Sequence, residues 1–222
     1  MTIHTHMASA DTLARAAARL KPARAPEGGA LPRAWLVSDP VRLPDPGPML
    51  ARMPRGAALL WRPYGLDRAG AERQGRVLRR LTRRLGVRLL VAGDARRAVV
   101  LGADGLHLPE GLARHGILAP LLLWHRAGRP RWLCVAAHGP RALARARALG
   151  ADVAVLSPVF PTASHPGAPV LGPVRFARLA ARAGLPLVAL GGITAVTARR
   201  LPPGCVVGLA AVSGWAAPGH RV

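Results

Sequence analysis

Lysine, acidic residues, aromatic residues and cysteine are all scarce in this sequence, and their scarcity excludes several kinds of protein. Aromatic residues make up only 4% of the chain, too few for the stacking platforms on which single-stranded nucleic acid binds. The two cysteines, Cys134 and Cys205, fall within strand-like apolar runs. We therefore expect reduced core thiols rather than a disulfide, as in a cytoplasmic protein. No apolar run reaches the roughly 20 residues that a membrane-spanning helix needs.

Basic residues outnumber acidic ones by 32 to 10, giving a formal net charge of +22, and Lys21 is the sole lysine. Such a charge would suit nucleic acid, because arginine neutralises phosphates. The arginines are, however, spread over helix-like segments such as 141–150 and 175–184, in which alanine and leucine form the other face. We interpret the charge as a general bias in composition, expect no nucleic-acid partner, and retain small phosphorylated ligands as partners.

The first 30 residues differ from the rest of the chain. They lack the apolar centre of a secretory signal, and their arginine-rich, acid-poor character fits both an organelle transit peptide and a helix followed by a linker. We favour a helix and linker over residues 1–30. The remaining residues, 31–222, are enough for one hydrophobic core and are expected to form a single domain. The sequence leaves the oligomeric state open, a homo-oligomer included.

A repeating pattern begins after residue 31: short apolar runs end in polar or glycine residues, and helix-like stretches such as 68–84 and 194–201 separate them. Strands that alternate with helices indicate a parallel sheet. Eight such units match an α/β fold of the (β/α)₈ TIM barrel class, whereas an open doubly wound sheet, the alternative, needs fewer strands. The eight runs are residues 34–39, 57–63, 87–94, 104–110, 131–138, 152–160, 185–194 and 205–214.

In such a barrel the chemistry lies at the carboxyl ends of the strands. The sixth run leads into "SPVFPTASHPGAPVLG" (157–172), a stiff loop that holds Thr162, Ser164 and His165. The loop could be a simple connector, but its position favours a binding role. His138 ends the fifth run, and histidine is the side chain best suited to general acid–base catalysis near neutral pH.

Two further groups of residues follow strand ends. Gly191–Gly192 and Ala210–Ala211 end the seventh and eighth runs, where exposed backbone N–H groups can bind a phosphate; tight packing at a turn would also explain the glycines. Asp94 and Glu110 end neighbouring strands and are the candidate ligands of a Mg²⁺ cofactor, although two carboxylates are not a complete site. His107 alternates with its leucine neighbours and is expected inside the barrel mouth.

Taken in order, the motifs "SD", "RP", "GD", "GADGLHL", "AAH", "SPVFPTASHPGAPVLG", "ALGGIT" and "AAVS" resemble those of the thiamine phosphate synthase/TenI superfamily over about residues 31–215. The resemblance implies a TIM-barrel transferase that joins hydroxymethylpyrimidine diphosphate to hydroxyethylthiazole phosphate and releases pyrophosphate with the help of Mg²⁺. It also assigns pyrophosphate binding to Arg62 and ligand binding to Thr162 and Ser164.

The chain departs from the family pattern mainly in the half of the site that holds Mg²⁺ and pyrophosphate. Tyr64 and His165 stand where the family has lysines, and Leu112 stands where it has a metal-binding aspartate, although Asp94 retains one metal ligand. The resemblance therefore predicts a degenerate site. Three functions remain open: a synthase of weakened activity, a metal-independent thiazole tautomerase that uses His138, and a non-catalytic binder of thiazole phosphate.

Overall fold

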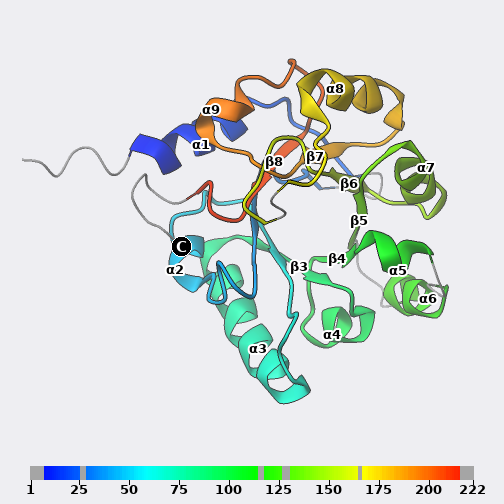
Figure 1. Ribbon diagram of the computed structural model, residues 1–222. Coiled ribbons are helices and arrows are strands. Elements are labelled where there is room, and N and C mark those ends of the chain that lie inside the picture. Colours follow the sequence, from blue (N-terminus) through cyan, green and yellow to red (C-terminus); the bar gives the residue numbers. More distant parts are fainter. Residues whose placement is uncertain (1–7, 26–28, 115–117, 127–130, 165–166, 216–222) are drawn as a thin grey trace, which may run out of the picture.

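Eight parallel strands close into a barrel in the computed structural model, which describes residues 8–25, 29–114, 118–126, 131–164 and 167–215 (Figure 1). Each strand pairs with the next along the chain, and β8 pairs with β1, which closes the sheet. The predicted (β/α)₈ barrel is thus confirmed, and the open sheet is excluded. The strands are β1 (Ala34–Val37), β2 (Ala58–Trp61), β3 (Arg88–Ala92), β4 (Gly105–Leu108), β5 (Trp132–Ala137), β6 (Val153–Leu156), β7 (Leu187–Ala189) and β8 (Gly208–Ala211).

Helices surround the barrel on its outside (Figure 1). Almost every strand residue is buried, because the strands face the barrel interior on one side and the helices on the other. The helices are α1 (Ala8–Ala18), α2 (Gly47–Leu50), α3 (Arg68–Leu85), α4 (Ala95–Val100), α5 (Glu110–Arg114), α6 (Leu118–Arg126), α7 (Pro140–Ala148), α8 (Gly172–Ala183) and α9 (Ala195–Ala198).

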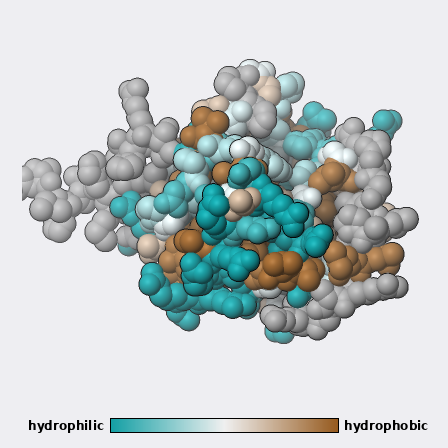
Figure 2. All heavy atoms as spheres, turned by 90° about the horizontal axis from the view of Figure 1, so that it is seen from below, coloured by the Kyte–Doolittle hydropathy of each residue, from teal (hydrophilic) through white to brown (hydrophobic). Residues whose placement is uncertain are grey.

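The residues at the two ends of helix α3 explain where it begins and where it ends. Its N-cap, Asp67, accepts a hydrogen bond from the backbone N–H of Gly70, and the helix ends at Gly86, whose φ of +67° suits glycine. Its exposed arginines are Arg68, Arg73, Arg76, Arg80, Arg83 and Arg84. The face that α3 occupies is broadly hydrophilic when the molecule is seen from below (Figure 2). Part of the net charge therefore lies on a solvated helix face.

Helix α9 is shorter than the expected segment 194–201. It covers only Ala195–Ala198, and the chain reaches Pro202–Pro203 soon afterwards. A residue that precedes proline is disfavoured in helical conformation, so the helix cannot extend through this point. None of the described helices is long and apolar enough to cross a membrane.

Part of the N-terminal segment packs on the barrel. Leu13 and Ala17 of α1 are buried. Arg33, which immediately precedes β1, donates Nη1–H to the carbonyl oxygens of Ala18 (2.6 Å) and Leu20 (3.2 Å). This contact therefore lies at the amino end of β1, away from the carboxyl ends of the strands, where the site was predicted.

Candidate functional site

A cavity of about 520 Å³ opens at the carboxyl ends of the strands. It brings together most of the residues expected to bind a ligand: Arg62, Glu110, His138, Thr162, Ser164, Gly191, Gly192, Ala210 and Ala211. Tyr64 and His107 line it as well. Asp94 is not among the lining residues, and His165 lies outside the described residues. The site is therefore built from loops that follow β1, β2, β4, β5, β6, β7 and β8.

Arg62, directly after β2, is held by the end of β1. Its Nε–H donates to the carbonyl oxygen of Ser38 (2.7 Å), and one Nη2 hydrogen donates to Oδ2 of Asp39 (3.0 Å). The Arg62 backbone N–H in turn donates to Oγ of Ser38 (2.7 Å). Burial lowers the pKa of the Arg62 guanidinium below its ordinary value, although the nearby Asp39 charge acts in the opposite direction. A guanidinium remains charged in either case, so Arg62 is a fixed cation at the edge of the cavity.

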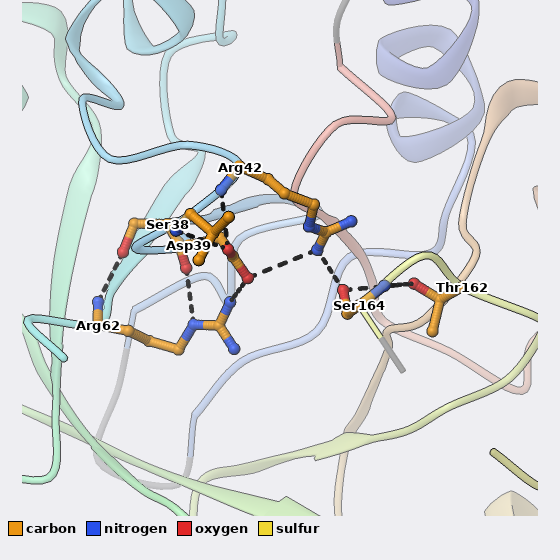
Figure 3. A network of polar contacts seen from close by, with 7 residues as sticks. Ser38, Asp39, Arg42, Arg62, Thr162 and Ser164 are labelled. Atoms are coloured by element: carbon orange, nitrogen blue, oxygen red, sulfur yellow. Dashed lines mark hydrogen bonds and ion pairs between the residues drawn. The ribbon is translucent and has the colours of Figure 1, made fainter. Parts of the chain in front are cut away.

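A second arginine, Arg42, reaches the same place from the β1–α2 loop (Figure 3). Its Nη2 lies 3.5 Å from Asp39 Oδ2 and donates to Oγ of Ser164 in the loop after β6. Thr162 accepts a hydrogen bond from the Ser164 backbone N–H (3.3 Å). The two hydroxyls are thereby connected to the cations at the mouth of the barrel. Sequence reasoning missed Arg42, because nothing distinguishes one arginine among so many.

Asp39 joins the two arginines. Burial by itself would raise the pKa of this carboxyl, but backbone N–H groups of Arg42 and Val41 and the charges of Arg42 and Arg62 outweigh it, so the pKa lies below its usual value. The carboxylate is accordingly ionised at neutral pH. One negative charge faces two positive ones, and this cluster has a net charge of about +1.

The glycine pair after β7 contacts the β6–α8 loop directly. The backbone N–H of Phe160 donates to the carbonyl oxygen of Gly191 (3.0 Å). A Cβ on Gly191 would lie 2.7 Å from Pro158 Cα, and one on Gly192 would lie 2.4 Å from the Pro161 carbonyl oxygen. Both residues also have positive φ angles, +94° and +62°. Glycine is thus required for packing here, whatever the backbone binds.

The N–H groups at the ends of β7 and β8 are available to a ligand to different degrees. Those of Gly191 and Gly192 donate to no acceptor within the described part of the chain. Ala210 and Ala211 still lie inside β8, where they pair with Trp35 and Leu36 of β1 and ladder bonds compete for their N–H groups. The first groups beyond the ladder belong to Val212 and Ser213, which also line the cavity. Ala210 and Ala211, which the sequence predicts as donors, line the cavity too, and their binding of a ligand stays a prediction.

His138 and Glu110 form a pair on the opposite arc of the barrel mouth, after β5 and β4. The Nδ1 atom of His138 lies 2.5 Å from Oε2 of Glu110, and the His138 backbone N–H donates to the same oxygen (3.1 Å). A carboxylate at Nδ1 favours a proton on that nitrogen, which makes Nε2 the basic atom of a neutral ring. This arrangement can transfer a proton to or from a ligand in the cavity.

Two other titratable groups that line the cavity are uncharged at neutral pH. Burial and the Arg62 charge lower the pKa of His107 to about 3, and its Nδ1 lies 3.2 Å from Cys134 Sγ. Burial also raises the pKa of Tyr64, against the effect of Arg62. The expectation that His107 lies inside the barrel mouth is confirmed, but as a buried neutral ring.

The carboxylates do not offer a good site for Mg²⁺. Asp94 caps α4 by accepting the Arg97 N–H (2.8 Å) and pairs with the Arg97 guanidinium (3.3 Å). Glu110 is engaged by His138. In the ranges that the structure describes, no three His, Cys, Asp or Glu side chains gather as metal ligands would. Enzymes usually hold Mg²⁺ with one or two carboxylates together with substrate phosphates and water. Because Asp94 does not line the cavity and is paired with Arg97, Asp94 and Glu110 do not fit a shared Mg²⁺ site in it.

Comparisons with known proteins agree with this architecture. Residues 51–215 match the model of the TMP-TENI family, described as thiamine monophosphate synthase. A thiamine-phosphate synthase from Thiobacillus denitrificans is 34% identical over 146 residues, which cover 65% of this chain and 67% of that protein. A relative from Geobacter sulfurreducens is 39% identical over 120 residues, covering 53% of this chain and 54% of the relative. The chain thus spans between about half and two-thirds of the length of these curated relatives.

A solved structure supports the fold independently. A thiamine phosphate pyrophosphorylase from Pyrococcus furiosus superposes with a TM-score of 0.66 at 21% sequence identity, over 82% of this chain and 85% of that chain. At that identity the likeness concerns the barrel alone.

Proposed function

Because this chain belongs to the thiamine monophosphate synthase/TenI family, we propose that it is a thiamine-biosynthetic transferase of weakened activity. In this proposal it joins hydroxymethylpyrimidine diphosphate to hydroxyethylthiazole phosphate and releases pyrophosphate. The observation that carries the proposal is the cavity at the strand ends, in which cations, hydroxyls and backbone N–H groups surround one space. We also propose that the protein acts in the cytoplasm, in keeping with its two free thiols.

The chemistry requires the protein to stabilise a leaving group. The bond between the pyrimidine methylene carbon and the diphosphate oxygen breaks, and its electron pair leaves with pyrophosphate. The thiazole nitrogen then donates its lone pair to the cationic methylene carbon and forms the new C–N bond. Fixed positive charge near the departing oxygens lowers this barrier. In the described part of the chain, Arg62 and Arg42 are the cations that line the cavity.

The thiazole phosphate is assigned to the part of the cavity between the β6–α8 loop and the ends of β7 and β8, next to the arginines. The N–H groups of Gly191 and Gly192, together with those after β8, would bind its oxygens, and Thr162 and Ser164 would donate hydroxyl hydrogens. The carboxylates present do not fit Mg²⁺, so no step is assigned to a metal. Losing several charge-stabilising groups at about 2–4 kcal/mol each would slow turnover by orders of magnitude.

The test is formation of thiamine phosphate together with pyrophosphate from the two substrates, measured with Mg²⁺ and with a chelator. We expect slow turnover. Tyr64→Lys, Leu112→Asp and His165→Lys in combination should raise the rate and make it depend on Mg²⁺. The position of Leu112 suits this change, because its Cδ1 lies 3.5 Å from where a Gly93 Cβ would be, beside the strand end that carries Asp94. Rapid Mg²⁺-dependent coupling by the unaltered protein would contradict the proposal of weakened activity.

A second function is favoured by one observation, the contact between His138 Nδ1 and Glu110 Oε2. A histidine oriented in this way could move a proton between two positions of a thiazole carboxylate phosphate, which would make the protein a metal-independent tautomerase. Isomerisation in the presence of a chelator, without pyrophosphate release, would support this alternative over the synthase. Ligand binding without turnover of either kind would identify a non-catalytic binder.

A further inference from the structure

The two cavity arginines form a closer unit than their positions in the chain suggest. Arg62 Nη2 lies 3.0 Å and Arg42 Nη2 lies 3.5 Å from the same oxygen, Oδ2 of Asp39. Their side chains are only 22% and 19% exposed, and that of Asp39 is 15% exposed. Two guanidinium groups around one carboxylate retain an excess positive charge that water screens only partly. An anionic ligand would balance it.

Arg42 is held at both ends of its side chain. Near its backbone, Oδ1 of Asp39 accepts hydrogen bonds from the N–H groups of Val41 (3.1 Å) and Arg42 (3.0 Å), and this fixes the turn. At its tip, Nη2 donates to Ser164 Oγ in the β6–α8 loop. In Figure 3 the guanidinium of Arg42 lies between Asp39 and Ser164, facing that of Arg62 across the carboxylate. A cation fixed in advance loses little conformational entropy when a ligand binds.

The remaining groups around the cavity do not compete for this role. Tyr64, beside Arg62, is a neutral phenol, and His107 is a neutral buried ring. The His138–Glu110 pair follows β5 and β4, on the other arc of the barrel mouth. The positive charge of the cavity is therefore concentrated where the ends of β1 and β2 meet the β6–α8 loop.

We propose that Arg42 is a specificity-determining residue, which together with Arg62 selects a ligand carrying a diphosphate over one carrying a single phosphate at this edge of the cavity. Each guanidinium presents a planar set of N–H donors to one phosphate group, and two adjacent guanidiniums match two linked phosphate groups. Nη1 of Arg42 and of Arg62 makes no hydrogen bond to any described residue, so these donors are available to the ligand. The choice of diphosphate rests on the proposed function.

The test measures dissociation constants for inorganic pyrophosphate and for inorganic phosphate by calorimetry. Arg42→Ala should weaken pyrophosphate binding about ten-fold or more, the scale of a lost charged hydrogen bond, and phosphate binding by less than about three-fold. Arg42→Gln, which can still donate to Ser164 without a charge, should do the same. Arg42→Lys should recover only part of the selectivity. Arg52→Ala, an exposed arginine outside the cavity, is the matched control and should change neither constant.

An unchanged pyrophosphate affinity in Arg42→Ala would overturn the proposal, as would an equal loss for both anions, which is the effect of net charge alone. Failure of the proposed function is a separate result. If pyrophosphate selectivity depends on Arg42 while the protein forms no thiamine phosphate, the role of Arg42 stands and the synthase proposal fails. If the unaltered protein does not bind pyrophosphate, both fail.

Discussion

Replacing Gly192 with alanine tests whether the β7 end holds the β6–α8 loop in place. The added Cβ would lie 2.4 Å from the carbonyl oxygen of Pro161 and 2.8 Å from Phe160 Cβ. Both neighbours belong to the loop that carries Thr162 and Ser164, and the closest atom is backbone. The clash can be relieved only if this loop moves away from the strand end.

The expected cost has two parts. Gly192 has φ of +62°, in the left-handed region, where a residue with a side chain costs about 1–2 kcal/mol. Forcing an extra methyl group into a packed site adds about 1–3 kcal/mol. Gly204→Ala is the matched control, because Gly204 also has a positive φ, +77°, but a Cβ there would meet nothing within 4 Å.

We therefore expect Gly192→Ala to lower the free energy of unfolding by about 2–5 kcal/mol and Gly204→Ala by about 1–2 kcal/mol, measured by urea denaturation. Gly192→Ala should also weaken pyrophosphate binding, because displacing the loop removes the support that Ser164 gives to Arg42. Equal stability losses in the two variants would refute the claim that packing on the loop requires glycine at this position.

We expect the stability to depend on pH through His107, because its pKa of about 3 in the folded protein lies below the 6.5 of an unperturbed histidine. As the pH falls, the unfolded chain therefore binds a proton before the folded protein does. From pH 7 to pH 5 the free energy of unfolding of the wild type should fall by up to about 2 kcal/mol, and His107→Gln should not show this decrease. Equal pH dependence would contradict this burial effect. For the alternative activity, Glu110→Gln should slow tautomerisation by His138 about ten- to a hundred-fold, while pyrophosphate affinity stays unchanged; unchanged isomerisation would exclude a role for Glu110 in positioning the ring.

The cluster of Arg42, Arg62 and Asp39 can be compared with the charges that the family resemblance implies at the same end of the cavity. Tyr64, where the resemblance implies a lysine, is neutral, and Leu112, where it implies an aspartate, is 45% exposed and offers no ligand oxygen. In the proposed function, Arg42 supplies a cation at the same end of the cavity from a different loop.

The sequence by itself determined the barrel. Eight apolar runs separated by amphipathic segments leave each strand with two faces to bury, and a closed parallel sheet inside a ring of helices satisfies all of them. The same periodicity located the strand ends, and with them Arg62, His138 and the glycine pair. These inferences needed only local spacing, since a strand end and the loop that follows it are neighbours in the chain.

Only the tertiary structure decided which of these groups act together. Arg42 and Ser164 are 122 positions apart, and no periodicity relates them; closure of the barrel brings the loops after β1 and β6 within hydrogen-bonding distance. The contact of Glu110 arises in the same way. Its carboxylate, a candidate metal ligand from the sequence, lies against His138, because the barrel places the carboxyl ends of β4 and β5 side by side.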